Sequence, residues 1–183
     1  MAKYINRVHE FRNPFADVIL SKTEKKEMNL FSDSQQKQLC SHLLKSTDNT
    51  SICILLSLYT GLRIGEICGL KWEDIDFEKS ILTVRRTVQR IRTGLHGTKL
   101  IVDTPKSRAS QRSIPISAFI IDILRKIRNS DSFYILSGNA KVTEPHTIQR
   151  KFKSILKKAE LSLVNYHSLC HMFWRSYGSK RDK

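Results

Sequence analysis

Residues 60–84 read TGLRIGEICGLKWEDIDFEKSILTV, and within this stretch the hydrophobic period changes from helical to strand-like. The segment LRIGEICGL predicts a short helix that ends near Gly69, because glycine commonly terminates helices. From Ile81 onward, Leu82 and Val84 alternate with more polar residues, which is the period of a half-buried strand. The stretch therefore predicts a domain in which helices lead into a small sheet.

Two helices are expected before this stretch. The first begins in FSDSQQKQLCSHLLKS (31–46), where Ser32 can cap the helix and Gln35 completes a capping box. The second lies in TSICILLSLYTG (50–61), which is apolar enough to be buried and is closed by Gly61.

Strand patterns and then helical patterns follow the opening stretch. Three strands with short connections favour an antiparallel meander, and they are expected at 81–91, 98–107 and 111–117. Helical periodicity returns in 117–129 and 146–161, and a last segment covers 165–178. This order indicates an α+β fold that is mostly helical, with a small three-stranded antiparallel sheet.

The composition indicates a nucleic-acid-binding protein of the cytoplasm. The 183 residues carry 32 Lys and Arg against 17 Asp and Glu, a formal charge of +15. Nucleic acid is the commonest partner for such a surplus, and a membrane surface is the second. No run of 18 apolar residues predicts a membrane span. Four scattered cysteines indicate free thiols in a reducing compartment.

The domain boundaries follow from the N-terminal stretch. Residues 1–30 have no secretory apolar segment, and NPF at 13–15 breaks regular structure. We therefore expect residues 1–30 to form an arm or linker and residues 31–183 to form one domain.

Basic residues gather in two regions of the sequence. Residues 85–112 hold eight Lys or Arg and one acid, and residues 141–159 hold six against one. Each region alone could be an ordinary solvated face, but together with the net charge they favour a phosphate-binding surface. The residues expected to contact DNA are Arg85, Arg86, Arg108, Arg112, Arg150, Lys151 and Lys153.

Two basic residues near turns are candidates for chemistry. Arg63 follows a glycine at a helix junction and could place its guanidinium fork on a phosphate. Glu66 could hold Arg63 in place or pair with another buried cation. A surface ion pair at this i,i+3 spacing is the plainer alternative. Lys106 lies between two expected strands and could donate a proton to a leaving oxygen, although it could also be a solvated turn lysine.

The sequence NYHSLCHMFWRSYG (165–178) leaves several interpretations open. A zinc site would need further ligands, and the spacing of His146 and Cys68 does not recommend them. A thiol nucleophile is weakly indicated, because Cys170 and its neighbour His171 point about a quarter turn apart on a helix. A wholly structural role is a third interpretation.

Taken in order, three motifs resemble one family. TGLRIGEICGLKWEDIDFEKSILTV, TPKSRASQRSIPI and HSLCH closely resemble the catalytic domain of tyrosine recombinases, specifically phage and conjugative-element integrases. The resemblance covers about residues 30–178. It implies site-specific integration and recombination of duplex DNA through a covalent 3′-phosphotyrosyl link, with no metal and no nucleotide cofactor. It also implies a homo-tetramer on DNA, a mobile-element origin and a place at the bacterial nucleoid, with no membrane.

The resemblance assigns a role to each matching residue. Arg63 matches the first of two arginines that brace the scissile phosphate, and Glu66 matches the acid that supports the site. Lys106 matches the hairpin lysine that protonates the leaving 5′-oxygen. His167 matches the histidine that opens the H-x-x-R motif and assists proton transfer. Such preorganised cations stabilise the negative charge of the phosphorane.

The sequence departs from the family pattern at Cys170, which stands in the slot of the second arginine. A thiol carries no positive charge near neutral pH and cannot fork onto two oxygens. His171 follows this slot, where the family often has a supporting histidine. The resemblance places the family's tyrosine nucleophile some thirty residues beyond the H-x-x-R motif, which is further along than residue 183.

The motifs leave the activity of this chain open. We expect residues 31–183 to form a truncated integrase catalytic domain that binds DNA but is inactive alone. The alternative is a non-catalytic DNA-binding remnant or a regulator of a mobile element. A basic RNA-associated domain is a third interpretation, which the ordered motifs disfavour.

Overall fold

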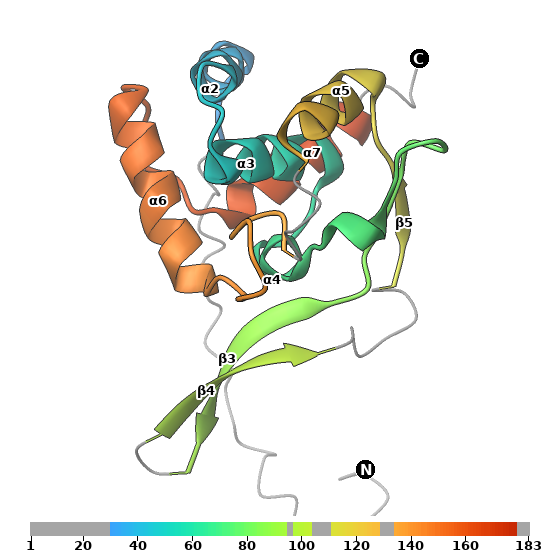
Figure 1. Ribbon diagram of the computed structural model, residues 1–183. Coiled ribbons are helices and arrows are strands. Elements are labelled where there is room, and N and C mark those ends of the chain that lie inside the picture. Colours follow the sequence, from blue (N-terminus) through green and yellow to red (C-terminus); the bar gives the residue numbers. More distant parts are fainter. Residues whose placement is uncertain (1–29, 95–96, 104–110, 129–133, 179–183) are drawn as a thin grey trace, which may run out of the picture.

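The computed structural model describes residues 30–94, 97–103, 111–128 and 134–178 (Figure 1). Its helices are α2 (Asp33–Leu44), α3 (Asn49–Thr60), α4 (Ile64–Gly69), α5 (Ala118–Ile127), α6 (Pro145–Lys158) and α7 (His167–Gly178), and a 3-10 turn, η1, covers Trp72–Asp74. Its strands are β1 (Ile75–Asp76), β2 (Ile81–Thr83), β3 (Thr87–Thr93), β4 (Gly97–Asp103) and β5 (Ser113–Pro115). The expected arm over residues 1–30 lies almost entirely outside the described residues.

The α+β fold class predicted from the sequence is confirmed. Helices precede and follow the strands, and the strands β1, β2 and β5 form a three-stranded antiparallel sheet. A second, two-stranded sheet consists of the hairpin β3–β4. This hairpin extends away from the helical body (Figure 1).

The strand pairing differs from the predicted meander. The single strand expected at 81–91 is divided into β2 and β3, which lie in different sheets, and β5 pairs with β2 instead of β4. The chain leaves the first sheet after Val84, where the Arg86 guanidinium donates a hydrogen bond to Asp74 Oδ2 at 2.7 Å. The period-two pattern continues through this break, so it does not reveal the change of sheet.

Helix α3 is the centre of the core. Almost all of its side chains are buried, and it contacts α2, α4, α5, α6 and α7. The predicted caps are confirmed, because Ser32 and Gln35 form the capping box of α2 and Gly61 ends α3 in the left-handed region with φ 66°. Across the described residues, no helix is long and apolar enough to cross a membrane.

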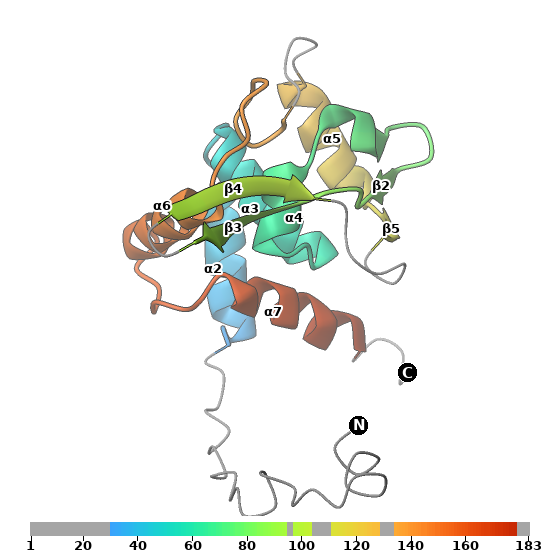
Figure 2. The same ribbon diagram turned by 90° about the horizontal axis from the view of Figure 1, so that it is seen from below.

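Gly65 lets α4 lie directly on the hairpin, and Gly69 lets it approach the residue just before the hairpin. A Cβ atom on Gly65 would be 2.6 Å from the backbone oxygen of Val88, and one on Gly69 would be 3.3 Å from the backbone of Arg86. Figure 2 shows β3 and β4 passing over α4. The hairpin is therefore attached to the body next to the start of α4, where Arg63 is located.

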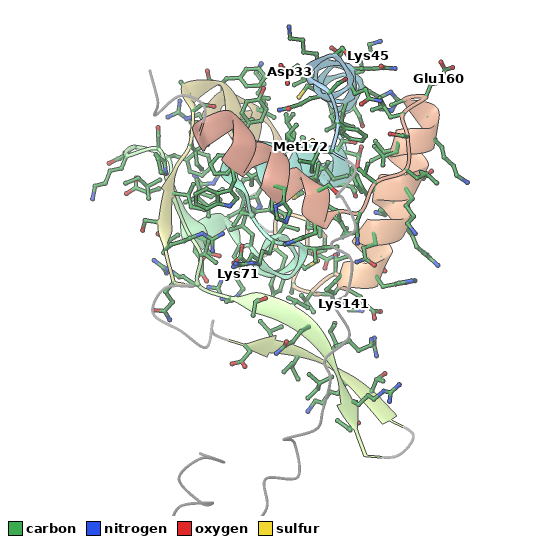
Figure 3. All side chains as sticks on the ribbon, turned by 180° about the vertical axis from the view of Figure 1, so that it is seen from behind. Asp33, Lys45, Lys71, Lys141, Glu160 and Met172 are labelled. Carbon is green, nitrogen blue, oxygen red and sulfur yellow. The ribbon has the colours of Figure 1, made fainter. Side chains whose placement is uncertain are left out.

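Helix α7 is seated against α3 by buried side chains. Met172 on its inner face is buried (Figure 3), and a Cβ atom on Gly61 would be 2.6 Å from the ring of Phe173. Just before α7, the buried hydroxyl of Tyr166 lies 2.7 Å from Ser57 Oγ of α3. These contacts place the first turn of α7 beside the junction between α3 and α4.

Candidate active site

Arg63 and Glu66 form a fixed pair at the start of α4. Arg63 is the N-cap residue, and its backbone N–H donates to Glu66 Oε2 at 2.8 Å while its Nη1 donates to Oε1 at 3.3 Å. The Arg63 side chain is 62% exposed, whereas that of Glu66 is only 5% exposed. The pair is thus not an ordinary surface ion pair, because its carboxylate is buried and holds an exposed guanidinium.

Arg112 completes this cluster from just before β5. Its Nη1 and Nη2 donate to the two oxygens of Glu66 at 2.8 and 2.9 Å, which is the bidentate geometry of a strong guanidinium–carboxylate pair. Burial alone would raise the pKa of Glu66, yet the bonds from Arg112 and from the Arg63 N–H hold that pKa below its ordinary value. Glu66 is therefore a carboxylate near neutral pH.

Helix α7 brings the HSLCH motif to the same cluster. The rings of His167 and His171 meet edge to face with their centroids 4.7 Å apart. Burial lowers the pKa of His167, and the charges of His171 and Arg63 lower it further. The structure thus brings His167 within electrostatic reach of Arg63, although the two residues are about a hundred positions apart in the sequence.

Cys170 faces the cluster but is bonded to the backbone. Its thiol is buried and donates a hydrogen bond to the carbonyl oxygen of Leu62 at 3.1 Å. Burial raises the pKa of this thiol, Glu66 raises it further, and Arg63 and Arg112 oppose them. The thiol therefore stays protonated near neutral pH and contributes no charge to the site.

A zinc site at HSLCH has no support in the structure. Among the described residues, no three His, Cys, Asp or Glu side chains are grouped to hold a metal ion. Cys68, one of the ligands considered from the sequence, is fully buried in the core, and burial raises the pKa of its thiol to about 12.

The basic residues expected to contact DNA have different surroundings. Arg86 donates to both Asp74 and Glu73, and the 56% exposed Arg85 has its Nε 3.7 Å from Asp74. Buried Asp74 thus anchors two arginines, a role that is not predicted from the sequence. The backbone N–H of Lys71 donates to Asp74 Oδ2 at the start of η1. An acid three positions after such a capping residue is a local signal for this carboxylate.

Helix α6 presents its basic residues outward. Arg150, Lys151 and Lys153 are exposed, and Lys151 donates to Thr50 Oγ1 of α3 at 3.1 Å. Lys106 and Arg108 lie outside the described residues. Arg112, which the charge pattern predicts to contact DNA, lies in the cluster around Glu66. The two residues are 46 positions apart in the sequence, so no local signal indicates this pair.

Solved structures of integrases have the same fold. One is the Tn1549 transposon integrase in complex with a circular intermediate DNA. The match covers 98% of the present chain and 64% of the Tn1549 integrase chain, with a TM-score of 0.71 and 22% identity. Another is a lambda integrase dimer bound to a core site. That match covers 97% of the present chain and 62% of the lambda integrase chain, with a TM-score of 0.59 and 18% identity. At these identities, the likeness shows the fold alone.

Two relatives found by sequence have a higher identity to this chain than those solved structures have. A XerC-like tyrosine recombinase of Caldanaerobacter subterraneus subsp. tengcongensis is 31% identical, over 80% of this chain and 42% of the relative. The tyrosine recombinase XerA of Pyrococcus furiosus is 32% identical, over 78% of this chain and 45% of the relative. The chain therefore spans less than half the length of these relatives.

The family is established by a match to most of the chain. Residues 19–179 match the phage integrase family, which confirms the resemblance drawn from the three motifs. The matched region contains Arg63, Glu66 and the HSLCH motif, and its described part has the fold of the solved integrases. The chain therefore belongs to the phage integrase family.

Proposed function

We propose that this chain is the DNA-binding catalytic domain of a site-specific recombinase and that the cluster around Arg63 holds one phosphodiester of duplex DNA. One observation carries the proposal: an exposed guanidinium is fixed by a buried carboxylate beside His167. Ordinary surface arginines have no such support. A preorganised guanidinium suits a phosphate because its fork matches two oxygens.

Each residue has a role in this proposal. Arg63 donates to the non-bridging oxygens, where negative charge develops during strand exchange, and Glu66 keeps it in place. His167, whose lowered pKa favours the neutral ring, is suited to accept and return a proton. Lys106, which lies outside the described residues, would donate a proton to the leaving oxygen.

In this proposal Cys170 affects cleavage of DNA more than binding to it. The neutral thiol leaves the phosphate with one arginine where the family pattern has two. Removing one donor of this kind costs about 10²–10³ in rate. The chain by itself is therefore expected to bind DNA without cleaving it.

A DNA-binding measurement tests the proposal. A fluorescein-labelled 30-base-pair duplex of arbitrary sequence is titrated with the protein, and the affinity is followed by anisotropy. About three phosphate contacts predict a loss of about 40-fold in affinity between 50 and 200 mM salt. Arg63→Gln should weaken binding about tenfold, because it removes a charge-assisted hydrogen bond.

Arg125→Gln is the matched control for the loss of one charge. Arg125 lies on α5, is 56% exposed and pairs with Asp122, so its replacement should change the affinity less than twofold. An affinity that is independent of salt, or equal effects of the two substitutions, would contradict phosphate binding at Arg63.

A non-catalytic DNA-binding remnant or regulator is the second candidate function. It is favoured by the burial of Cys170 and its bond to Leu62, which give the second-arginine slot a purely structural use. In a catalytic domain the slot still faces the phosphate, so Cys170→Arg should tighten DNA binding about tenfold. In a remnant whose slot no longer faces DNA, the affinity would not change.

A suicide DNA substrate provides the second readout for Cys170. We expect the wild-type chain to give no covalent adduct on a denaturing gel at concentrations that saturate binding. An adduct with the wild-type chain would show that a neutral thiol at this position permits cleavage.

The assembly and the place of action follow from the same proposal. A lambda integrase tetramer bound to a Holliday junction shares the fold, with a TM-score of 0.57 at 19% identity, and this supports a homo-oligomer on DNA for the present chain. Its place of action would be the bacterial nucleoid in the cytoplasm, since chromosomal DNA is located there. Residues 31–183 would form the catalytic domain and residues 1–30 its arm.

A further inference from the structure

The Glu66 carboxylate accepts hydrogen bonds from two arginines that use it differently. Arg112 donates two short, parallel bonds of 2.8 and 2.9 Å and has a side chain that is 29% exposed. Arg63 donates a single, longer side-chain bond of 3.3 Å and is 62% exposed. Arg112 is therefore the principal counter-ion of the carboxylate, and Arg63 is held at its edge.

The three charges sum to one net positive charge at the site. Arg63 and Arg112 contribute two positive charges and Glu66 one negative charge. The nearby Cys170 is neutral, because burial raises the pKa of its thiol. His167 has a lowered pKa, because of burial and the charges of His171 and Arg63.

Removing Arg112 and removing the charge of Glu66 change this sum in opposite directions. Without Arg112, the Glu66 carboxylate would be compensated by Arg63 alone, and the net charge would fall to zero. Without the charge of Glu66, both guanidinium groups would remain and the net charge would rise to two. A phosphate that approaches Arg63 is sensitive to this sum, because charges near a protein surface interact over several ångströms.

We propose that Arg112 is a positioning residue that acts through charge: it neutralises Glu66, so that the positive charge of Arg63 remains available to a DNA phosphate. The inference rests on the proposed function, since it names what sustains phosphate binding at the same site. In the described part of the chain, the Arg63 guanidinium uses one of its N–H groups in a side-chain bond. Its other N–H groups are then available to the oxygens of a phosphate.

Charge neutralisation and simple fastening predict different signs for Glu66→Gln. If Arg112 acts through charge, Arg112→Gln weakens binding to the 30-base-pair duplex about fivefold. Glu66→Gln then strengthens binding by a similar factor, because the amide oxygen still accepts a hydrogen bond from Arg63 while the negative charge is lost. The double substitution restores the original sum and should return the affinity to within about twofold of the wild type. If the pair only fastens α4 to β5, both single substitutions loosen Arg63 and both weaken binding.

Matched controls separate the local effect from the overall charge. Glu78→Gln raises the net charge by one, as Glu66→Gln does, and Arg125→Gln lowers it by one, as Arg112→Gln does, but both lie at exposed positions. Each control should change the affinity less than about twofold. Arg112→Lys keeps the charge but loses the fork, and it should keep the affinity within about threefold of the wild type. Thermal melting of each variant shows that it is folded at the temperature of the titration.

The outcomes distinguish this inference from the proposed function. If Arg63→Gln weakens binding and Glu66→Gln also weakens it, the phosphate site stands and the charge role of Arg112 is wrong. If Arg63→Gln leaves the affinity unchanged, both are wrong. Opposite signs for Glu66→Gln and Arg112→Gln, with recovery in the double variant, support the inference.

Discussion

Gly65→Ala is expected to lower the free energy of unfolding by about 2–3 kcal/mol, because the new methyl group has no space. Its Cβ would lie 2.6 Å from the backbone oxygen of Val88 and 2.7 Å from Thr87 Oγ1. A backbone oxygen within a strand can move only if the hairpin moves. The substitution should also displace Arg63, so DNA affinity should fall together with stability.

Gly69→Ala is the control for this prediction. Its Cβ would contact the backbone of Arg86 at 3.3 Å, and this mild crowding is opposed by a gain of about 1 kcal/mol in helix propensity. Urea unfolding should therefore show little change for Gly69→Ala. Equal stability of Gly65→Ala and the wild type would mean that α4 does not rest on the hairpin through Gly65.

Phe152→Ala is expected to destabilise the domain by about 3–5 kcal/mol, the usual cost of removing a buried aromatic ring. Phe152 is 1% exposed, and its ring meets that of Tyr166 edge to face with centroids 5.3 Å apart. Tyr166 immediately precedes His167, so the lost ring also supports the start of α7. Urea unfolding measures the stability, and the DNA titration measures the effect on the site.

Phe119→Ala provides a matched control, because Phe119 is 47% exposed on α5. Its replacement should cost less than about 1 kcal/mol. A similar loss of stability for both phenylalanine variants would contradict the assignment of Phe152 to the core.

Local sequence signals predicted the elements that depend on neighbouring residues. The capping box of Ser32 and Gln35 consists of hydrogen bonds between residues only three positions apart, so the local sequence is enough to predict it. The same holds for Gly61, whose left-handed φ is a property of a single residue. The i,i+3 spacing of Arg63 and Glu66 likewise gave the correct pair, although not the burial of its carboxylate.

Long-range contacts decided the features that the sequence did not reveal. Arg112 reaches Glu66 across 46 positions, and its own neighbours only suggested a basic strand. The break between β2 and β3 depends on where Asp74 holds Arg86, and an alternating pattern contains no information about that contact. These features depend on which distant residues pack together in three dimensions, and a single sequence does not reveal that packing.

The bond from Cys170 to Leu62 bears on how such a domain can evolve. The thiol ties α7 to the residue just before Arg63, and this tie lies beside the site proposed to hold the phosphate. A single substitution of Cys170 by arginine would break that tie before the longer side chain found new partners. Lineages that carry a thiol at this position are therefore expected to exchange it for arginine only alongside compensating changes in the α3–α4 junction.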